Sequence, residues 1–259
     1  MSTHQPDFTL RLATNDDDLF AAQRLRYEVF VKELGGDGAL VDHDRQLEVD
    51  KYDPFFDHLL LLDQSRGDTV LKQIVGVYRL LRDDQMPKIG QFYTESEYDL
   101  SVLKSSGRKL LELGRSCLHK DYRGGTAMYV LWNGLAEYVT QHGIEILFGT
   151  ASFHGTDPDA LAAPLSLLHH RHLAPAELRV RALTQHFTEL NRIAEDDIDR
   201  RAAMVAVPAL IKGYLRLGGF VGEGAFVDQA FNTTDVCLVM DTKRLSETQK
   251  KIYSRGKTA

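Results

Sequence analysis

The stretch ELGRSCLHKDYRGGTAMYVLWNGLAEY, which runs from Glu112 to Tyr138, is the part of the sequence that decides the fold. It begins as an apolar strand, passes through a basic turn with two adjacent glycines, and continues as an amphipathic helix. Free backbone N–H groups point outward at the start of a helix, so a glycine-bearing turn at that position commonly receives an anion. The stretch therefore predicts a strand–turn–helix unit with an anion site at the turn.

Strand and helix patterns continue on both sides of this stretch. The predicted strands cover 8–13, 58–63, 70–82, 109–119, 144–151 and 235–241, and the predicted helices cover 18–34, 126–142, 157–173, 183–198 and 208–217. This order predicts a mixed α/β sheet flanked by helices and containing a βαβ unit. We expect a single domain over 1–245, with a helical insertion at about 157–217 and a polar tail at 246–259.

Composition restricts the class of protein. The chain has 259 residues and a formal net charge of −6, so a chain-wide surface for nucleic acid is not expected. Cys117 and Cys237 are the only cysteines, too few for a disulfide framework, and a reducing cytoplasm is the expected compartment. Neither a signal-peptide pattern nor an apolar run of membrane-spanning length is present.

The turn itself allows two interpretations. Acetyltransferases that bind CoA have the spacing Arg/Gln-x-x-Gly-x-Gly/Ala between a central strand and a helix. Here the run from Arg123 to Ala127 reads RGGTA, with its glycines one or two positions early. The pattern is compatible with a phosphate-binding turn, and equally with a strand–helix turn in which the glycines only provide tightness.

Charged residues gather in two further places. Glu48, Asp50, Asp53 and Asp57 follow one another closely, and they could neutralise an amine substrate, bind a hard cation or simply solvate a loop.

Glu112 and Arg115 lie three apart on a predicted strand, hence on opposite faces unless a β-bulge intervenes. Buried charges require partners, so an internal salt-bridge network with Arg79 or Arg26 is the alternative to a functional role for this pair.

These positions together resemble the signature of acyl-homoserine lactone synthases, which have the acetyltransferase (GNAT) fold. The residues that carry the resemblance are Arg26, Phe30, Glu48, Asp50, Asp53, Arg79, Glu112 and Arg115. One position departs from the pattern, because Gly35 and Gly36 lie where that family has a tryptophan. The likeness implies a GNAT-like acyl-CoA N-acyltransferase fold.

Longer phrases resemble a different family, the ornithine-acyl-[acyl carrier protein] N-acyltransferases. The phrases cover 119–138, 148–175 and 208–245, and the likeness extends from about Leu10 to Leu245. It implies transfer of a 3-hydroxyacyl chain from acyl carrier protein to the α-amino group of L-ornithine, which gives lyso-ornithine lipid. The 4′-phosphopantetheine of the carrier would be the acyl donor, with no cofactor bound by the enzyme itself. Its single phosphodiester would contact the residues of the turn, which are Lys120, Arg123, Gly124, Gly125 and Thr126.

The resemblance also implies roles at the reacting centre. The expected catalytic residues are Glu48, Glu112 and Arg115, with Glu48 favoured as the base that accepts the amine proton. The expected substrate-binding residues are Arg26, Phe30, Asp50, Asp53, Asp57 and Arg79. Asp50, Asp53 and Asp57 could pair with the two ammonium groups of ornithine. Its carboxylate could be held by Arg26, Arg79 or Arg115.

Several alternatives stay open. A lactone synthase, another amino-acid N-acyltransferase, or a non-catalytic module that binds lipid or carrier would fit part of the pattern. The histidines around His169 suggest a metal, but no further ligand is indicated and no metal site is predicted. The expected location is the cytoplasm, and the stretch with Lys212 and Arg216 could contact the inner membrane from the surface, although a core helix is the simpler interpretation.

Overall fold

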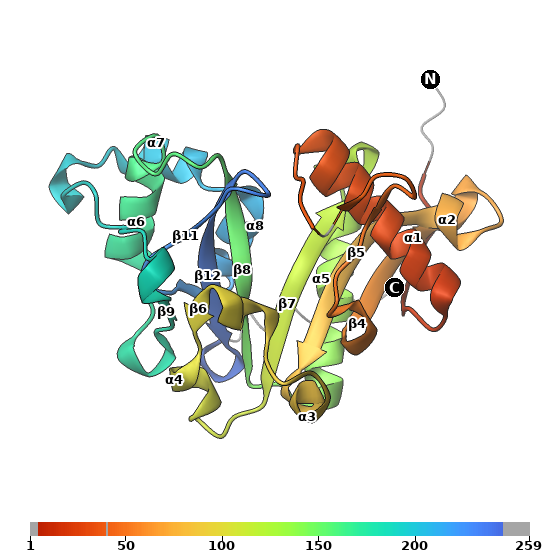
Figure 1. Ribbon diagram of the computed structural model, residues 1–259, viewed down its shortest axis with the longest axis horizontal. Helices are drawn as coiled ribbons and strands as arrows, with labels where there is room; N and C mark the ends of the chain where they lie inside the picture. The colour runs from red at the N-terminus through yellow and green to blue at the C-terminus, as the bar shows by residue number, and fades with distance from the viewer. Residues whose placement is uncertain (1–4, 40, 246–259) are drawn as a thin grey trace. The chain divides into compact units, whose positions relative to one another are not determined.

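The computed structural model describes residues 5–39 and 41–245 (Figure 1). Contacts between residues divide the chain into two compact units. The first unit holds the described residues of 1–81 and 113–143, and the second unit holds 82–112 and the described residues of 144–250. Strand β7 (Leu110–Leu118) supplies residues to both units. The predicted mixed α/β architecture is confirmed.

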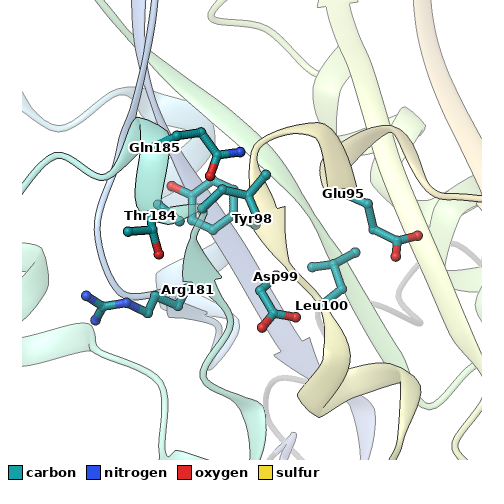
Figure 2. A pocket seen from close by; sticks show the side chains of 9 residues that line it. Glu95, Tyr98, Asp99, Leu100, Arg181, Thr184 and Gln185 are labelled. Carbon is teal, nitrogen blue, oxygen red and sulfur yellow. The ribbon is translucent and has the colours of Figure 1, made fainter.

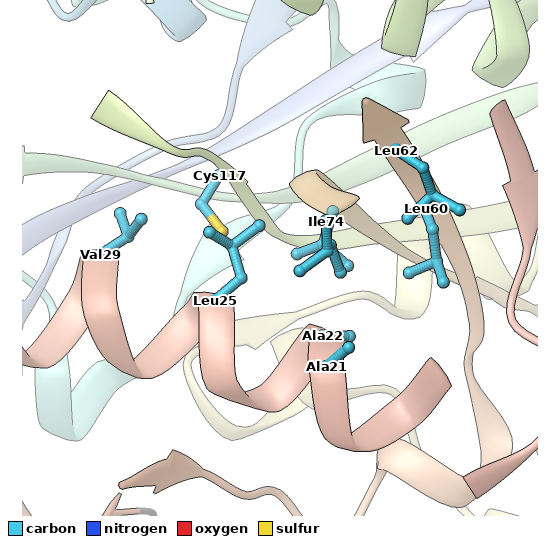
Figure 3. Packing of buried hydrophobic residues seen from close by; sticks show 9 residues of the cluster. Ala21, Ala22, Leu25, Val29, Leu60, Leu62, Ile74 and Cys117 are labelled. Atoms are coloured by element: carbon cyan, nitrogen blue, oxygen red, sulfur yellow. The ribbon is translucent and has the colours of Figure 1, made fainter. Parts of the chain in front are cut away.

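The first unit has antiparallel strands with a helix on each face. Strand β1 (Phe8–Leu12) pairs with β4 (Asp57–Asp63), which pairs with β5 (Ile74–Arg82), and β7 follows in the strand order. Helix α1 (Asp16–Arg26) packs on one face, where its side chains form an apolar cluster with β4, β5 and Cys117 (Figure 3). Helix α5 (Ala127–His142) packs on the other.

Helix α1 begins where local chemistry fixes its start. The side chain of Asn15 accepts a hydrogen bond from the backbone N–H of Asp18, and three aspartates occupy the first turn, where the helix dipole favours negative charge. After Arg26 the chain continues as a π-helix, η1 (Tyr27–Glu33). Together these two elements confirm the helix predicted at 18–34.

Helix α5 approaches the sheet closely at a glycine. A Cβ atom at Gly134 would lie 2.0 Å from Cδ2 of Leu10 and 3.4 Å from Cδ2 of Leu59. A side chain at this position would therefore force the Leu10 side chain to move if α5 is to keep its distance from β1 and β4.

We expect Gly134→Ala to lower the free energy of unfolding by about 1–3 kcal/mol, because overpacking outweighs the roughly 1 kcal/mol gain in helix propensity. Chemical denaturation measures this change. Glu137→Ala, at an exposed position on the same helix, is the matched control and should stay within about 0.5 kcal/mol of the wild type. A stabilised Gly134→Ala variant would mean that the contact relaxes freely.

The second unit is organised around a long antiparallel pair. Strand β8 (Ile146–His154) pairs along its whole length with β12 (Thr233–Asp241), and its first residues run parallel to β7 at 110–112. Strands β7 and β8 are connected by α5, as the predicted βαβ unit requires. Strands β10 (Phe220–Val221) and β11 (Phe226–Asp228) also pair with β12, and β6 (Tyr98–Asp99) pairs with β9 (Arg181–Ala182).

The remaining elements are short. They are β2 (Val41–Asp42), β3 (Leu47–Glu48), α2 (Val70–Gln73), α3 (Met86–Ile89), α4 (Ser101–Lys104), α6 (Ala162–His172), α7 (Arg200–Ala206) and α8 (Ala209–Arg216). In the part of the chain that the structure describes, every helix is too short or too polar to span a bilayer. The tail predicted at 246–259 lies outside the described residues.

Three predicted elements differ from the structure. The helix predicted at 157–173 begins only at Ala162, as α6. The helix predicted at 183–198 is wrong, because the backbone there bonds to other elements: Thr188 exchanges hydrogen bonds with Ala225, and the N–H groups of Arg192 and Ile193 donate to the Ser166 hydroxyl. The strand predicted at 70–82 begins only at Ile74, after the single helical turn α2.

Candidate active site

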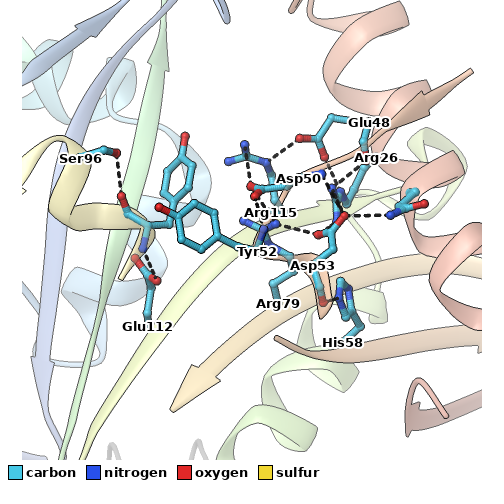
Figure 4. A network of polar contacts seen from close by, with 12 residues as sticks. Arg26, Glu48, Asp50, Tyr52, Asp53, His58, Arg79, Ser96, Glu112 and Arg115 are labelled. Carbon is cyan, nitrogen blue, oxygen red and sulfur yellow. Dashed lines mark hydrogen bonds and ion pairs between the residues drawn. The ribbon is translucent and has the colours of Figure 1, made fainter. Parts of the chain in front are cut away.

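Six charged side chains meet inside the first unit and form what we call the charged cluster (Figure 4). Its members are Arg26, Glu48, Asp50, Asp53, Arg79 and Arg115. They come from the end of α1, from β3 and the loop after it, from β5 and from β7. All six were predicted as site residues, and the structure brings them together.

Arg26 holds the two sides of the cluster together. Its side chain is fully buried, and all three guanidinium nitrogens donate hydrogen bonds. Nε donates to the Glu48 carboxylate, Nη2 to the Glu48 backbone carbonyl at 2.7 Å, and Nη1 to Oδ1 of Asp53 at 2.7 Å. Each guanidinium nitrogen of Arg26 therefore already donates to an acceptor within the protein.

Glu48 is buried between two arginines. One carboxylate oxygen accepts from Arg26 and the other from Nε of Arg115 at 3.1 Å. Burial alone would raise the pKa of Glu48, but the charges of Arg115 and Arg26 hold that pKa below its ordinary value. The side chain is consequently ionised at neutral pH.

Asp53 is the most heavily bonded carboxylate of the cluster. It accepts from Arg26, from Nη1 of Arg79 at 2.8 Å and from the amide of Gln23 at 2.9 Å. Burial opposes its ionisation, and the arginine charges outweigh burial, so the pKa of Asp53 lies far below its ordinary value. Gln23 was not predicted as part of the site; its position one helical turn before Arg26 is the signal that could have found it.

Asp50 and Arg79 complete the cluster. Oδ1 of Asp50 accepts from the backbone N–H of Tyr52 at 2.7 Å, and Oδ2 lies 3.0 Å from Nη1 of Arg79. The guanidinium of Arg79 also lies over the ring of Phe56, 4.2 Å from its centroid, as in a cation–π contact. Phe56 was not predicted, and no sequence pattern marks it.

Arg115 reaches Glu48 from an irregular position in β7. Its φ of +49° lies in the left-handed region, which is costly for a residue with a side chain. Arg115 therefore departs from extended strand geometry at this point of β7. The bond from Nε to Glu48 accounts for the direction of its side chain.

His58 borders the cluster as a neutral group. Its Nε2 lies 3.0 Å from the backbone carbonyl of Asp53, to which it donates. Burial lowers the pKa of His58 to about 4. With His58 uncharged, the three arginines and three carboxylates of the cluster balance.

The buried histidine predicts a pH dependence of stability. In the unfolded chain a histidine has a pKa near 6.5, so the unfolded state takes up the proton first as the pH falls. We expect the free energy of unfolding to drop by up to about 3 kcal/mol between pH 7 and 4, with no further loss from this residue below pH 4. Denaturation at a series of pH values measures the slope. His58→Gln should remove the part of the slope that His58 contributes, whereas the exposed control His43→Gln should keep it.

Two of the predicted substrate-binding residues lie apart from the cluster. Asp57 is on the opposite face of β4 from His58, where its carboxylate accepts a 2.5 Å hydrogen bond from the hydroxyl of Tyr138 on α5. Phe30 is partly buried and packs against the apolar cluster under α1. In the same apolar cluster, burial raises the pKa of the Cys117 thiol to about 12, which agrees with its interpretation as a core residue.

The turn before α5 has the predicted conformation of a strand–turn–helix unit. Gly124 has a φ of +76°, and Thr126 precedes the helix without a side-chain cap. Arg123 donates to the Leu118 carbonyl and forms an ion pair of 2.7 Å with Glu33. Lys120 and Gly125 are exposed, and a Cβ atom at Gly125 would meet little. The anion site stays a prediction.

Glu112 belongs to the second unit. It is buried, and its two carboxylate oxygens accept hydrogen bonds from the backbone N–H groups of Tyr93 at 2.9 Å and Thr94 at 2.6 Å. The carboxylate thus fixes the turn that begins at Tyr93.

A pocket in the same unit borders β6 and β9 (Figure 2). Glu95 and Arg181 in its lining already pair with Lys104 and Glu223, and none of the predicted site residues lines it.

Comparison with known proteins defines the class. Residues 25–133 match the model of the acetyltransferase (GNAT) domain family. Among solved structures, the CoA-dependent acyl-homoserine lactone synthase BjaI has a TM-score of 0.55 at 15% identity and covers 96% of this chain and 89% of its own. FeeM, an N-acyl amino acid synthase from uncultured soil microbes, has a TM-score of 0.51 at 10% identity and covers 93% of both chains. The fold is that of GNAT acyltransferases, as predicted.

Sequence relatives define the family more narrowly. The L-ornithine N(alpha)-acyltransferase of Rhodobacter capsulatus is 57% identical over 96% of this chain and 95% of its own length. That of Brucella abortus is 40% identical over 94% of this chain and 88% of its own. The chain belongs to the L-ornithine N(alpha)-acyltransferase family.

Proposed function

We propose that this protein transfers an acyl chain to the α-amino group of L-ornithine. The observation that carries the proposal is the 57% identity, over nearly the full length of both chains, to a protein named for that activity. The charged cluster supports it, because it places ionised carboxylates and guanidinium groups together, and these are the groups that pair with the ammonium and carboxylate groups of an amino acid.

The acyl donor that we propose is a 3-hydroxyacyl-acyl carrier protein, whose 4′-phosphopantetheine carries the chain as a thioester. The α-amine attacks the thioester carbonyl, the new C–N amide bond forms, the C–S bond breaks, and the amine proton leaves with the pantetheine thiol. The product is lyso-ornithine lipid. The phosphodiester of the arm would lie at the turn 120–126, where free backbone N–H groups at the start of α5 favour an anion.

The amine must lose a proton before it attacks, because an α-amino group has a pKa of about 8. We propose Glu48 as the carboxylate that receives this proton. Its low pKa keeps it ionised and ready to accept, and the same low pKa means that the proton passes on to solvent or to the leaving thiolate. Glu112 is the second candidate, and both of its oxygens accept hydrogen bonds, from Tyr93 and Thr94, as both oxygens of Glu48 do from Arg26 and Arg115.

The acyl product would remain close to a bilayer, and we propose a weak peripheral contact through α8. Ile211 and Tyr214 bury one side of this helix, while Lys212 and Arg216 lie on its more accessible side. Basic side chains at such a position favour anionic headgroups.

One experiment tests the activity directly. Purified protein is mixed with 3-hydroxyacyl-acyl carrier protein and with L-ornithine, L-lysine, L-glutamine or S-adenosylmethionine, and free thiol and product mass are followed. We expect thiol release with ornithine and a product acylated at the α-nitrogen. Thiol release with S-adenosylmethionine and a lactone product, or no release with any acceptor, would overturn the proposal.

A further inference from the structure

Arg79 leaves two of its three guanidinium nitrogens without a hydrogen bond among the described residues. Its side chain is almost fully buried, and only Nη1 engages the carboxylates of Asp50 and Asp53. Nε and Nη2 find no hydrogen-bond partner among the described residues. A buried guanidinium with two unused nitrogens carries a desolvation cost, which a ligand able to accept both hydrogen bonds would remove.

The two nitrogens together form one edge of the guanidinium. Nε–H and the neighbouring Nη2–H point in the same direction, and this side-on fork matches the two oxygens of a carboxylate. Asp50 and Asp53 lie at the other side, against Nη1. The fork therefore has the geometry to bind an external carboxylate in addition to those of Asp50 and Asp53.

Gly114 lies directly against this fork. A Cβ atom at Gly114 would stand 3.6 Å from Nη2 and 3.7 Å from Nε of Arg79, so any larger residue would occupy the space next to both nitrogens. Gly114 is also only half-buried, whereas Arg79 is not exposed. Gly114 is thus a partly accessible backbone position directly against a buried edge.

The other arginines of the cluster do not offer such an edge. Arg26 uses Nε, Nη1 and Nη2 on Glu48 and Asp53. Arg115 directs its Nε to Glu48, so one of the two nitrogens of its side-on edge is already engaged. The sequence left open which of the three arginines would hold the carboxylate, and the contacts distinguish them.

We propose that the side-on edge of Arg79 binds the α-carboxylate of the amino-acid acceptor, and that Gly114 keeps the approach to this edge open. The inference rests on the proposed function for the identity of the acceptor. Asp50 supports it, because its Oδ2 lies beside the same guanidinium and accepts no hydrogen bond from the described residues, which suits the ammonium group next to that carboxylate.

Gly114→Ala tests the proposal with little risk to folding. The added methyl group would be in ordinary van der Waals contact with its neighbours, and Gly114 does not have a positive φ. Isothermal calorimetry measures the binding of L-ornithine and of 1,4-diaminobutane, which is ornithine without its carboxylate. Turnover of both amines with the acyl donor is measured in parallel.

We expect the wild type to bind ornithine at least about 10-fold more tightly than the diamine, as a charge-assisted pair of hydrogen bonds implies. Gly114→Ala should weaken ornithine binding by about 10- to 100-fold and raise its KM, while binding of the diamine changes by less than about 3-fold. Ser116→Ala, on the same strand and also half-buried, is the control and should leave both ligands unchanged.

Arg79→Lys is the second variant, since it keeps the positive charge but loses the fork. It should weaken ornithine binding by a similar factor and spare the diamine. Equal losses for both ligands, or no loss for ornithine in Gly114→Ala, would overturn the carboxylate site. If the wild type acylated ornithine and 1,4-diaminobutane equally well, this inference would be overturned and the proposed function would stay intact. If ornithine bound more tightly than the diamine but neither was acylated, the carboxylate site would stand and the proposed function would be overturned.

Discussion

Replacing Arg26 with glutamine is expected to lower the free energy of unfolding by about 3–5 kcal/mol, a third or more of the stability of a typical domain. The reason is the position of the guanidinium, which is fully buried between the carboxylates of Glu48 and Asp53. Without it, Arg79 and Arg115 are the cationic partners that remain for the two buried negative charges among the described residues. Urea denaturation followed by circular dichroism measures the change.

The matched control is Arg45→Gln. This side chain is 66% exposed and lies 4.0 Å from Asp42, so its removal should cost less than about 0.5 kcal/mol. If Arg26→Gln unfolded within about 1 kcal/mol of the wild type, the remaining arginines would suffice to compensate the carboxylates, contrary to the prediction.

Glu48→Gln should reduce kcat for acyl transfer by about 10²- to 10⁴-fold, the range typical for loss of a general base. The change keeps the shape of the side chain but removes the charge that Arg26 and Arg115 share. Because stability falls as well, activity is compared at a temperature where the circular dichroism spectra of variant and wild type agree.

A pH profile of activity distinguishes a catalytic role of Glu48 from a purely structural one. Since the pKa of Glu48 is lowered, wild-type kcat/KM should not lose activity from this group until the pH falls below about 4.5, and it should rise towards pH 8 as the free amine of ornithine forms. Glu28→Gln, an exposed change in the π-helix, should be silent. A folded Glu48→Gln enzyme with more than about a tenth of wild-type kcat would remove Glu48 from the list of bases.

The charged cluster could be predicted from the sequence because burying an unpaired charge costs much free energy. Arginines and carboxylates within apolar stretches, such as Arg79 in β5, need opposite charges nearby, so a network among them was a physical necessity before any role was assigned. Which arginine retains unused donors depends on distances of a few tenths of an ångström, and no spacing in the sequence contains that information.

The predictions that the structure does not bear out also have physical causes. Asp57 and His58 alternate in β4, and periodicity says only that they point to opposite faces, not which face carries the cluster. The sequence around Arg115 does not indicate its positive φ, because glycine is the residue that usually adopts this conformation. The segment 183–198 has helix-like spacing, but Ser166 and Ala225 satisfy its backbone, and such distant partners are invisible to a local pattern.

The interleaving of the two units along the chain has a consequence for how the protein is made. A growing chain that has reached residue 112 contains neither unit complete, because the first still lacks 113–143 and the second lacks everything from 144 onward. At that stage α1 has left the ribosome without Cys117 to cover its apolar face, and Glu48 without Arg115. Contacts between segments so distant in sequence form slowly, and nascent chains are prone to association in that interval. Residues 113–143 are thus the segment whose arrival allows the first unit to close, and a chaperone would be of most use just before it emerges.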